Sequence, residues 1–347
     1  TWSVAQTPEK YATIKEAMEN ALKGKATLLY TQGCNIWRNQ QLQKNGEFDK
    51  PLNWGDENEL KKEALKIAKE ADVIVCAMGE SADMSGECGS RTNLEMPDVQ
   101  HELLAELVKL GKPVVLLNFA GRPTVLSWEK QYVPAIMNVW FGGSEMGDAL
   151  CDVIFGDKVP SGKLTTSMPK TTGQAPIYYN HHNTGRPVPD DNKEFAKYAS
   201  NCLDVSNGPL YPFGYGLSYT TFEYSNFKLS SQEADINGNQ EATEWQNGKK
   251  ITATVTVKNT GARDADEVVQ LYIRDMVASI SRPVKELKGF QRIHLVAGES
   301  KEVSFEITPD MLKFYNIELK HVIEPGDFQI MVGANSREVK TLNFNVK

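Results

Sequence analysis

The chain has 347 residues, of which 40% are hydrophobic and 24% charged, so it is long enough for two domains with ordinary cores. Its formal net charge of −7 argues against nucleic acid or an anionic membrane surface as a partner. No apolar run approaches the roughly 20 residues that a membrane-spanning helix needs, so we expect no membrane span.

The chain opens on Thr1 rather than Met and shows no signal peptide, which predicts a processed or excised piece. Its cysteines are odd in number and widely spaced, and no CxxC motif or Cys/His cluster predicts zinc or another metal. Cys76 and Cys151 lie in apolar segments and are expected to be packed thiols. Cys88 could act as a nucleophile, but no histidine partner is obvious.

The first 155 residues alternate helical and strand-like patterns. Thr7, followed by Pro8, predicts a helix start, and apolar positions from Tyr11 to Leu22 then share one face. A strand is expected at 26–30, and Asp56 with Glu59 predicts the start of a helix that ends near Ala71. The remaining expected elements are strands at 73–78, 114–119 and 135–141 and helices at 98–110, 124–128 and 144–154. Helices between apolar strands predict a mostly parallel sheet.

Residues 156–220 lack periodicity and are rich in proline, glycine and tyrosine, which predicts an extended connector that packs against the rest of the chain. From residue 222 onward, strand candidates follow one another at short spacing. They lie at 222–229, 250–259, 267–274, 284–293, 302–307, 326–332 and 342–346. This pattern predicts an immunoglobulin-like β-sandwich after the α/β domain.

Acidic side chains are concentrated in the segment 79–92, which directly follows the apolar strand expected at 73–78. Glu80, Asp83 and Glu87 stand among small residues, together with the cation Arg91. Open α/β sheets build their ligand sites at the carboxyl ends of strands. A glycosidase of the two-carboxylate type needs a general acid that can reach the leaving oxygen, which a glutamate on a glycine-flanked loop can do. The alternative is a solvated acidic turn.

Several stretches of this sequence resemble glycoside hydrolase family 3, in particular its bacterial β-glucosidase branch. They are Gly-Glu followed by Ser-Gly-Glu-Cys-Gly-Ser-Arg-Thr within 79–92, Gly-Lys-Pro-Val-Val-Leu-Leu-Asn-Phe-Ala-Gly-Arg-Pro at 111–123, Trp-Phe-Gly-Gly-Ser-Glu-Met-Gly at 140–147, Phe-Gly-Asp-Lys-Val-Pro-Ser-Gly-Lys-Leu at 155–164, Asn-Thr-Gly-Arg-Pro at 183–187, Tyr-Pro-Phe-Gly-Tyr-Gly-Leu-Ser-Tyr-Thr-Thr-Phe at 211–222 and Ser-Arg-Pro-Val-Lys-Glu-Leu-Lys-Gly-Phe at 281–290. Their order along nearly the whole chain makes the resemblance specific.

The resemblance implies an α/β sandwich domain at 1–210 and a fibronectin type III-like domain at 221–347. In such enzymes a preceding barrel supplies the nucleophilic aspartate, and this barrel is absent here. The resemblance places the general acid/base at Glu87, with Glu80 as the second choice. Arg91 and Asp83 would bind substrate or order the loop. The first strand of the α/β domain would also be absent, so the barrel and that strand belong to the missing N-terminal part.

The resemblance further implies hydrolysis of an oligosaccharide or β-glucoside substrate with retention, no cofactor, and a periplasmic or secreted location. Two alternatives are open: a non-catalytic carbohydrate-binding or scaffolding fragment, and a phosphorylase on the same framework. The glycone and the linkage are undecided, as is the oligomeric state, for which a homodimer is one option.

Overall fold

The computed structural model describes residues 11–40, 53–81, 84–87, 89–192 and 194–347. Its contacts divide the chain into two compact units. The first unit comprises the chain up to Lys158 together with Met168–Ala175, and the second comprises Val159–Ser167 and Pro176–Lys347. Most of the predicted connector thus packs with the second unit. The domain boundary near residue 210 stays a prediction.

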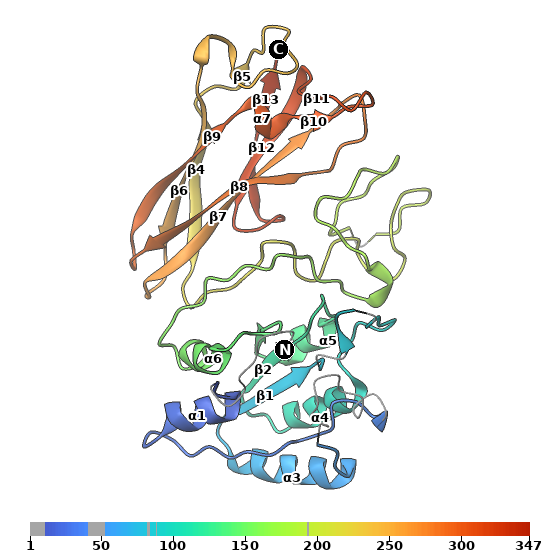
Figure 1. Cartoon of the computed structure of the whole chain (residues 1–347), viewed down its shortest axis with the longest axis vertical. Helices are drawn as coiled ribbons and strands as arrows, with labels where there is room; N and C mark the ends of the chain where they lie inside the picture. The colour runs from blue at the N-terminus through green and yellow to red at the C-terminus, as the bar shows by residue number, and fades with distance from the viewer. Residues whose placement is uncertain (1–10, 41–52, 82–83, 88, 193) are drawn as a thin grey trace. The chain divides into compact units, whose positions relative to one another are not determined.

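A parallel sheet forms the centre of the first unit (Figure 1). Its strands are β1 (Ile74–Gly79), β2 (Val114–Phe119) and β3 (Ala135–Asn138), hydrogen-bonded in that order. The register pairs Gly79 with Phe119, so the carboxyl ends of β1 and β2 lie side by side. Loops that leave these two strands therefore start as neighbours, as the sequence-based fold class requires.

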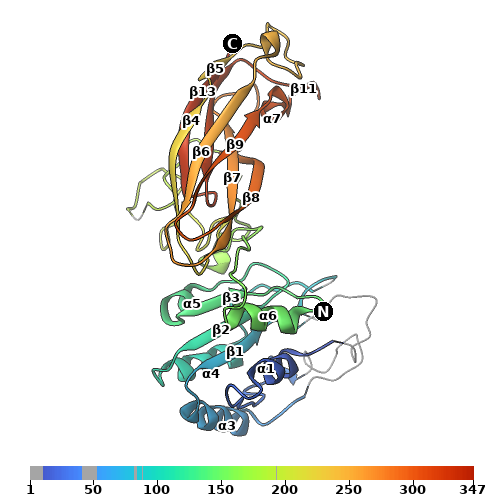
Figure 2. The same cartoon turned by 90° about the vertical axis from the view of Figure 1, so that its left-hand side faces the viewer.

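Helices α3 and α4 cover one face of this sheet, as both views show (Figure 2). Ala64 and Ala68 of α3 pack with Leu103 and Leu104 of α4 in one apolar core, which includes the inward side chains of β1 and β2. In the described part of the unit, the helices are α1 (Ile14–Leu22), α3 (Glu57–Glu70), α4 (Asp98–Val108), α5 (Ser127–Tyr132), α6 (Met146–Ile154) and the short 3₁₀ helix η3 (Thr172–Gln174). Across the described ranges, none of the helices combines the length and hydropathy needed to cross a membrane.

Asp56 caps α3 as the sequence predicts, since its carboxylate accepts hydrogen bonds from the backbone of Asn58 and Glu59. The first helix was predicted to begin after Thr7, which lies outside the described residues. Helix α1 instead begins at Ile14, and Thr13 forms a capping box with Glu16. This local pair of hydrogen bonds defines the start of α1, so Tyr11 precedes the helix instead of lying on its apolar face.

Two further expectations for this unit differ from the structure. Residues 26–30 are not paired as a strand, because apolar character alone supplies no hydrogen-bonded neighbour. The strand expected at 73–78 is apolar at every position up to Met78, but burial alternates along β1, and Val75 is 36% exposed. The helix expected at 124–128 begins at Ser127, and β3 ends at Asn138.

The second unit is a sandwich of two antiparallel-type sheets, as predicted (Figure 1). One sheet has the order β5-β13-β12-β7-β8 and the other β4-β6-β9. The strands are β4 (Phe222–Leu229), β5 (Glu233–Ala234), β6 (Ile251–Asn259), β7 (Ala265–Asp275), β8 (Glu286–Leu295), β9 (Ser300–Ile307), β12 (Gly326–Gly333) and β13 (Val339–Val346). Alternate side chains of β6 are buried between the sheets, which explains its alternating sequence pattern. In β7, Val269, Leu271 and Ile273 belong to the same core, and the residues between them are buried as well.

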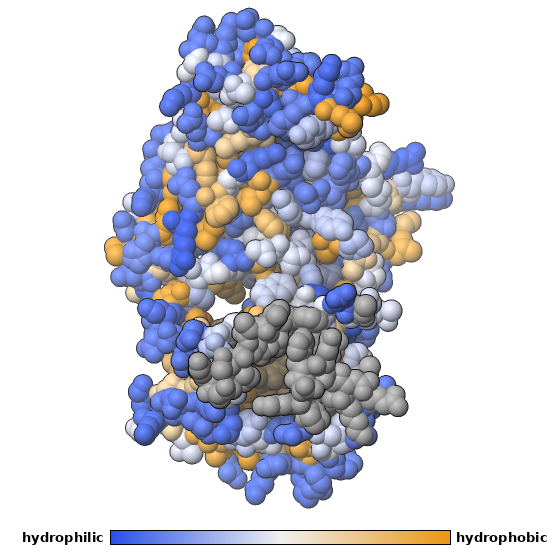
Figure 3. Space-filling view, in the orientation of Figure 1, coloured by the Kyte–Doolittle hydropathy of each residue, from blue (hydrophilic) through white to orange (hydrophobic). Residues whose placement is uncertain are grey.

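A small hairpin of the second unit carries exposed apolar side chains. It consists of β10 (Phe314–Tyr315) and β11 (His321–Val322) and follows helix α7 (Pro309–Leu312). Between the two strands, Ile317 is 86% and Leu319 81% exposed. Figure 3 shows this apolar tip as a hydrophobic group at the edge of a largely hydrophilic surface. The short strands of the hairpin were too brief for the sequence pattern to reveal.

The connector is joined to the sandwich by a buried charged pair. Lys163 Nζ lies 3.0 Å from Glu267 Oε1, and the side chains are 12% and 4% exposed. Tyr224 Oη donates a hydrogen bond of 3.1 Å to the same carboxylate, and burial raises the pKa of this phenol. Aromatic stacking of Tyr179 on Phe213 adds to the packing of the connector. The connector is therefore ordered by specific contacts although it has almost no regular structure.

Replacing Lys163 by Met should lower the free energy of unfolding of the second unit by ~3–5 kcal/mol, because Glu267 is then buried without its cation. Adding Glu267→Gln should recover part of this loss. As a control, Lys228→Met removes an exposed pair with Glu302 and should cost less than ~1 kcal/mol. Urea unfolding with hydrogen exchange of the β7 amides measures these effects. Strictly additive losses would argue against a coupled pair.

Candidate active site

The chain turns sharply where β1 ends. Gly79 has φ +133°, and a Cβ there would lie 1.9 Å from the carbonyl oxygen of Phe119. Gln100 of α4 holds both backbone groups of Gly79: its Oε1 accepts from the Gly79 N–H (2.6 Å) and its Nε2 donates to the Gly79 carbonyl (2.8 Å). The Glu80 N–H then donates to Phe119 at 2.7 Å. The position of Glu80 is thus defined by contacts from two neighbouring elements.

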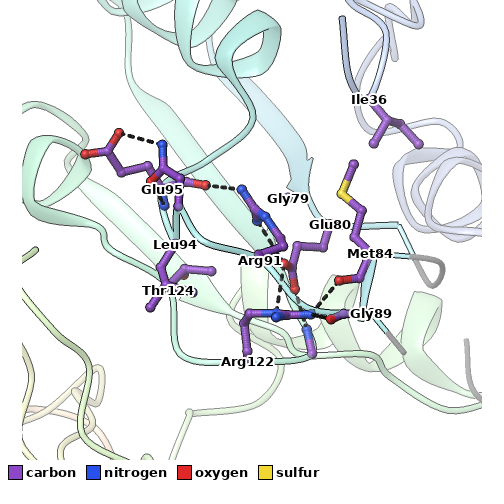
Figure 4. Close-up of polar contacts among 12 residues, drawn as sticks. Ile36, Gly79, Glu80, Met84, Gly89, Arg91, Leu94, Glu95, Arg122 and Thr124 are labelled. Atoms are coloured by element: carbon purple, nitrogen blue, oxygen red, sulfur yellow. Dashed lines mark hydrogen bonds and ion pairs between the residues drawn. The ribbon is translucent and has the colours of Figure 1, made fainter. Parts of the chain in front are cut away.

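Glu80 is buried, and its side chain is 1% exposed. Its Oε1 lies 2.8 Å from Arg91 Nη1 and 3.1 Å from Arg122 Nε, while its Oε2 accepts a hydrogen bond from the Gly121 N–H at 3.1 Å. Figure 4 shows this carboxylate between the two guanidinium groups. Both oxygens are occupied, so a substrate atom has no access to them.

Arg91 connects the far end of the loop to Glu80. Its side chain is 7% exposed, its Nη2 donates to the carbonyl of Glu95 at 2.8 Å, and its guanidinium lies 5.2 Å from the centre of the Trp37 ring. The loop therefore leaves β1 at Glu80 and returns to the same carboxylate at Arg91. This arrangement joins the two described ends of the loop through one ion pair.

Arg122 was not singled out by the sequence analysis, although it lies in the Gly-Arg-Pro stretch that follows β2. Its Nη2 donates to the carbonyl of Met84 and, at 2.6 Å, to the carbonyl of Gly89 (Figure 4). A cation directly after the neighbouring strand was the available signal, because loops after adjacent parallel strands meet. Gln100 was also missed, and only its place on an expected helix pointed to it.

Glu87 lies in a turn and is exposed. Within the part of the chain that the structure describes, its carboxylate has no hydrogen bond or ion pair. The structure thus separates two carboxylates that lie close in sequence: Glu80 is enclosed and Glu87 is accessible to a ligand. Asp83 and Cys88 fall outside the described residues.

Two cysteines of this unit can be assessed as nucleophiles. Burial, as the main cause, and the negative charge of Glu57, as the second, raise the pKa of the Cys34 thiol to about 11. Burial also raises the pKa of the Cys76 thiol to about 12. Both are therefore thiols at neutral pH. In the described ranges, no group of three His, Cys, Asp or Glu side chains is arranged to hold a metal ion. Of Glu80 and Glu87, the two glutamates that the sequence singled out, Glu87 is the exposed one.

Comparisons with known proteins agree with this architecture. A family model described as the glycosyl hydrolase family 3 C-terminal domain matches residues 1–219. A second model, described as a fibronectin type III-like domain, matches residues 267–336. The two matches fall on the α/β unit with its connector and on the β-sandwich.

Relatives and solved structures extend these matches over the whole chain. A periplasmic β-glucosidase of Salmonella typhimurium is 42% identical over 100% of this chain and 44% of its own length. A β-xylosidase of Formosa agariphila is 38% identical over 98% of this chain and 42% of its own. Among solved structures, a β-glucosidase from Listeria innocua in complex with glucose superimposes with a TM-score of 0.81 and 35% sequence identity. The match covers 100% of this chain and 43% of that protein. The chain thus spans less than half the length of these proteins.

The turn at Gly79 can be tested by substitution. Gly79→Ala should destabilise the first unit by at least ~2 kcal/mol more than Gly111→Ala, because strain and overpacking each cost ~1–3 kcal/mol. Both glycines have positive φ, but a Cβ at Gly111 meets nothing within 4 Å. Thermal unfolding of the two variants measures the difference. Equal destabilisation would show that the contact with β2 carries no cost.

Proposed function

Because the chain belongs to glycoside hydrolase family 3, we propose that it is the C-terminal part of a retaining exo-β-glucosidase, to which it contributes the general acid/base Glu87. The observation that carries this assignment is the difference in access between Glu87 and Glu80. A general acid must come within hydrogen-bond distance of the leaving oxygen. Glu87 is exposed at a strand end, whereas Glu80 is enclosed by two arginines.

In the proposed reaction, an aspartate of the missing N-terminal barrel attacks the anomeric carbon, and the bond to the leaving oxygen breaks. Glu87 donates its proton to that oxygen. In the second step Glu87 accepts a proton from water, the water oxygen bonds to the anomeric carbon, and the aspartate leaves as a carboxylate. Two displacements retain the β configuration. The residues of this chain supply no nucleophile in this scheme, so we propose that the chain alone is inactive.

The similar proteins support a β-glucoside as substrate. Structures of the Listeria innocua enzyme were determined with glucose and gluconolactone, and a mutant form was determined with laminaribiose. A β-xyloside stays an alternative because two relatives from Formosa agariphila are described as β-xylosidases, one of them as a putative one. The periplasmic relative from Salmonella typhimurium supports an exported protein. A phosphorylase would require phosphate for product formation, which the assay below can include.

Glu87→Gln in the full-length protein should lower kcat/KM for alkyl β-glucosides by ~10²–10⁴-fold, the usual contribution of general acid catalysis. For an activated dinitrophenyl β-glucoside the loss should stay below ~10-fold, because this leaving group needs little protonation. The matched control Glu80→Gln should be milder, since it reaches Glu87 only indirectly, through the contacts of Arg91 and Arg122 with the loop. If Glu80→Gln discriminates between the leaving groups more strongly than Glu87→Gln does, the assignment to Glu87 is wrong.

The division of the active site can be tested with the chain itself. Alone, it should not hydrolyse an activated aryl β-glucoside, and addition of the separately produced N-terminal part should restore hydrolysis. Activity of the chain alone would show that the nucleophile is among these 347 residues. If sugar binds without turnover both to the chain alone and after addition of the N-terminal part, the carbohydrate-binding alternative is favoured.

A further inference from the structure

We propose that Arg122 is a positioning residue for Glu87, an inference that rests on the proposed acid/base role of that glutamate. Arg122 lies outside the acidic loop, directly after β2. Its guanidinium nevertheless contacts that loop at Glu80, at Met84 and at Gly89. The last two contacts are to backbone carbonyls on either side of Glu87.

These carbonyl contacts distinguish positioning from simple charge pairing. The Arg122 side chain is 20% exposed, and its charge is paired with Glu80 at 3.1 Å. The hydrogen bonds to Met84 and Gly89 neutralise no charge. They hold the main chain three residues before and two residues after Glu87 against the end of β2. The short turn that carries the proposed acid/base is therefore held from a second strand.

The chemistry of the side chain explains why an arginine stands here. Its planar fork points Nη2 at two carbonyls, while Nε lies 3.1 Å from the Glu80 carboxylate as an ion pair and makes no hydrogen bond among the described residues, so one rigid group contacts three points of the loop. A lysine has a single nitrogen on a flexible stem and cannot reproduce that spread. Arg122→Lys keeps the charge and should position the loop only in part.

Close packing beside Arg122 limits the loop further. A Cβ added at Gly121 would lie 1.8 Å from Ser85 Oγ and 2.7 Å from Ser85 Cβ. Ser85 is 7% exposed and precedes Glu87 by two residues. The loop thus lies directly on the peptide of Gly121, and Gly121→Ala must displace it even though Arg122 is retained. This provides a second, independent way to move Glu87.

The test uses the full-length protein and the two substrates introduced for Glu87→Gln. Misplacing a catalytic group by about 1 Å can cost ~10²-fold in rate. Arg122→Gln and Gly121→Ala should therefore lower kcat/KM for an alkyl β-glucoside by ~10²-fold and for the dinitrophenyl β-glucoside by less than ~10-fold. Azide, which attacks without a general base, should accelerate turnover of the dinitrophenyl substrate in both variants. For Arg122→Lys, the ratio of the loss in kcat/KM on the alkyl substrate to the loss on the dinitrophenyl substrate should lie between the ratios of the unaltered protein and Arg122→Gln.

The control is Arg292→Gln, which breaks an exposed ion pair with Asp266 on the sandwich and should leave both values unchanged. Hydrogen exchange of the amides at 84–87 should increase in Arg122→Gln but not in this control. Equal losses on both substrates, or no loss, would overturn the positioning role. If Arg122→Gln does not fold, the ratio for Arg122→Lys decides. If Glu87→Gln itself fails to discriminate, the proposed function fails instead.

Discussion

One buried carboxylate between two guanidinium groups determines the arrangement of the candidate site. Glu80 directly follows β1, and Arg122 lies in the segment after β2. Arg91 lies in the loop that joins β1 to α4 and binds Glu80 from there. Burying charges costs free energy unless they are paired and hydrogen-bonded. Among the described residues, Arg122 shares this carboxylate with Arg91, and its Nη2 donates hydrogen bonds to carbonyl oxygens of the loop. The cluster therefore defines backbone geometry more than it adds stability, since a protein gains little from a buried ion pair as such.

The parallel sheet makes this cluster possible. In-register pairing of Gly79 with Phe119 brings the ends of β1 and β2 together, and Gln100 fixes the peptide groups at the turn. A glycine is needed at residue 79 because the backbone of β2 occupies the place of a side chain. At this edge, two glutamates that lie close in sequence differ in exposure. Glu80 is held and enclosed, and Glu87 extends from the segment that Glu80 and its partners restrain.

Local patterns predicted elements well where each residue interacts with its sequence neighbours. Alternation revealed β6, and Asp56 marked the start of α3, because both signals depend on short-range hydrogen bonding and side-chain periodicity. The same reasoning placed a strand at 26–30, where an apolar run lacks the neighbour that a strand needs. It also placed a helix start at Thr7, which lies outside the described residues, and it missed Thr13. The capping box with Glu16 marks Thr13 as the start of α1.

The sequence by itself determined the fold class, the strand that leads into the acidic loop, and the short set of residues from which a general acid could come. Composition and spacing contain that information, because they reflect burial and local conformation. Only the tertiary structure decided that Glu80 is enclosed and Glu87 accessible, and that Arg122 takes part. The contacts between Arg122 and the loop join segments that follow two separate strands and lie more than 30 positions apart in the chain. Such contacts arise only when the sheet brings two strand ends together, and no local pattern encodes them.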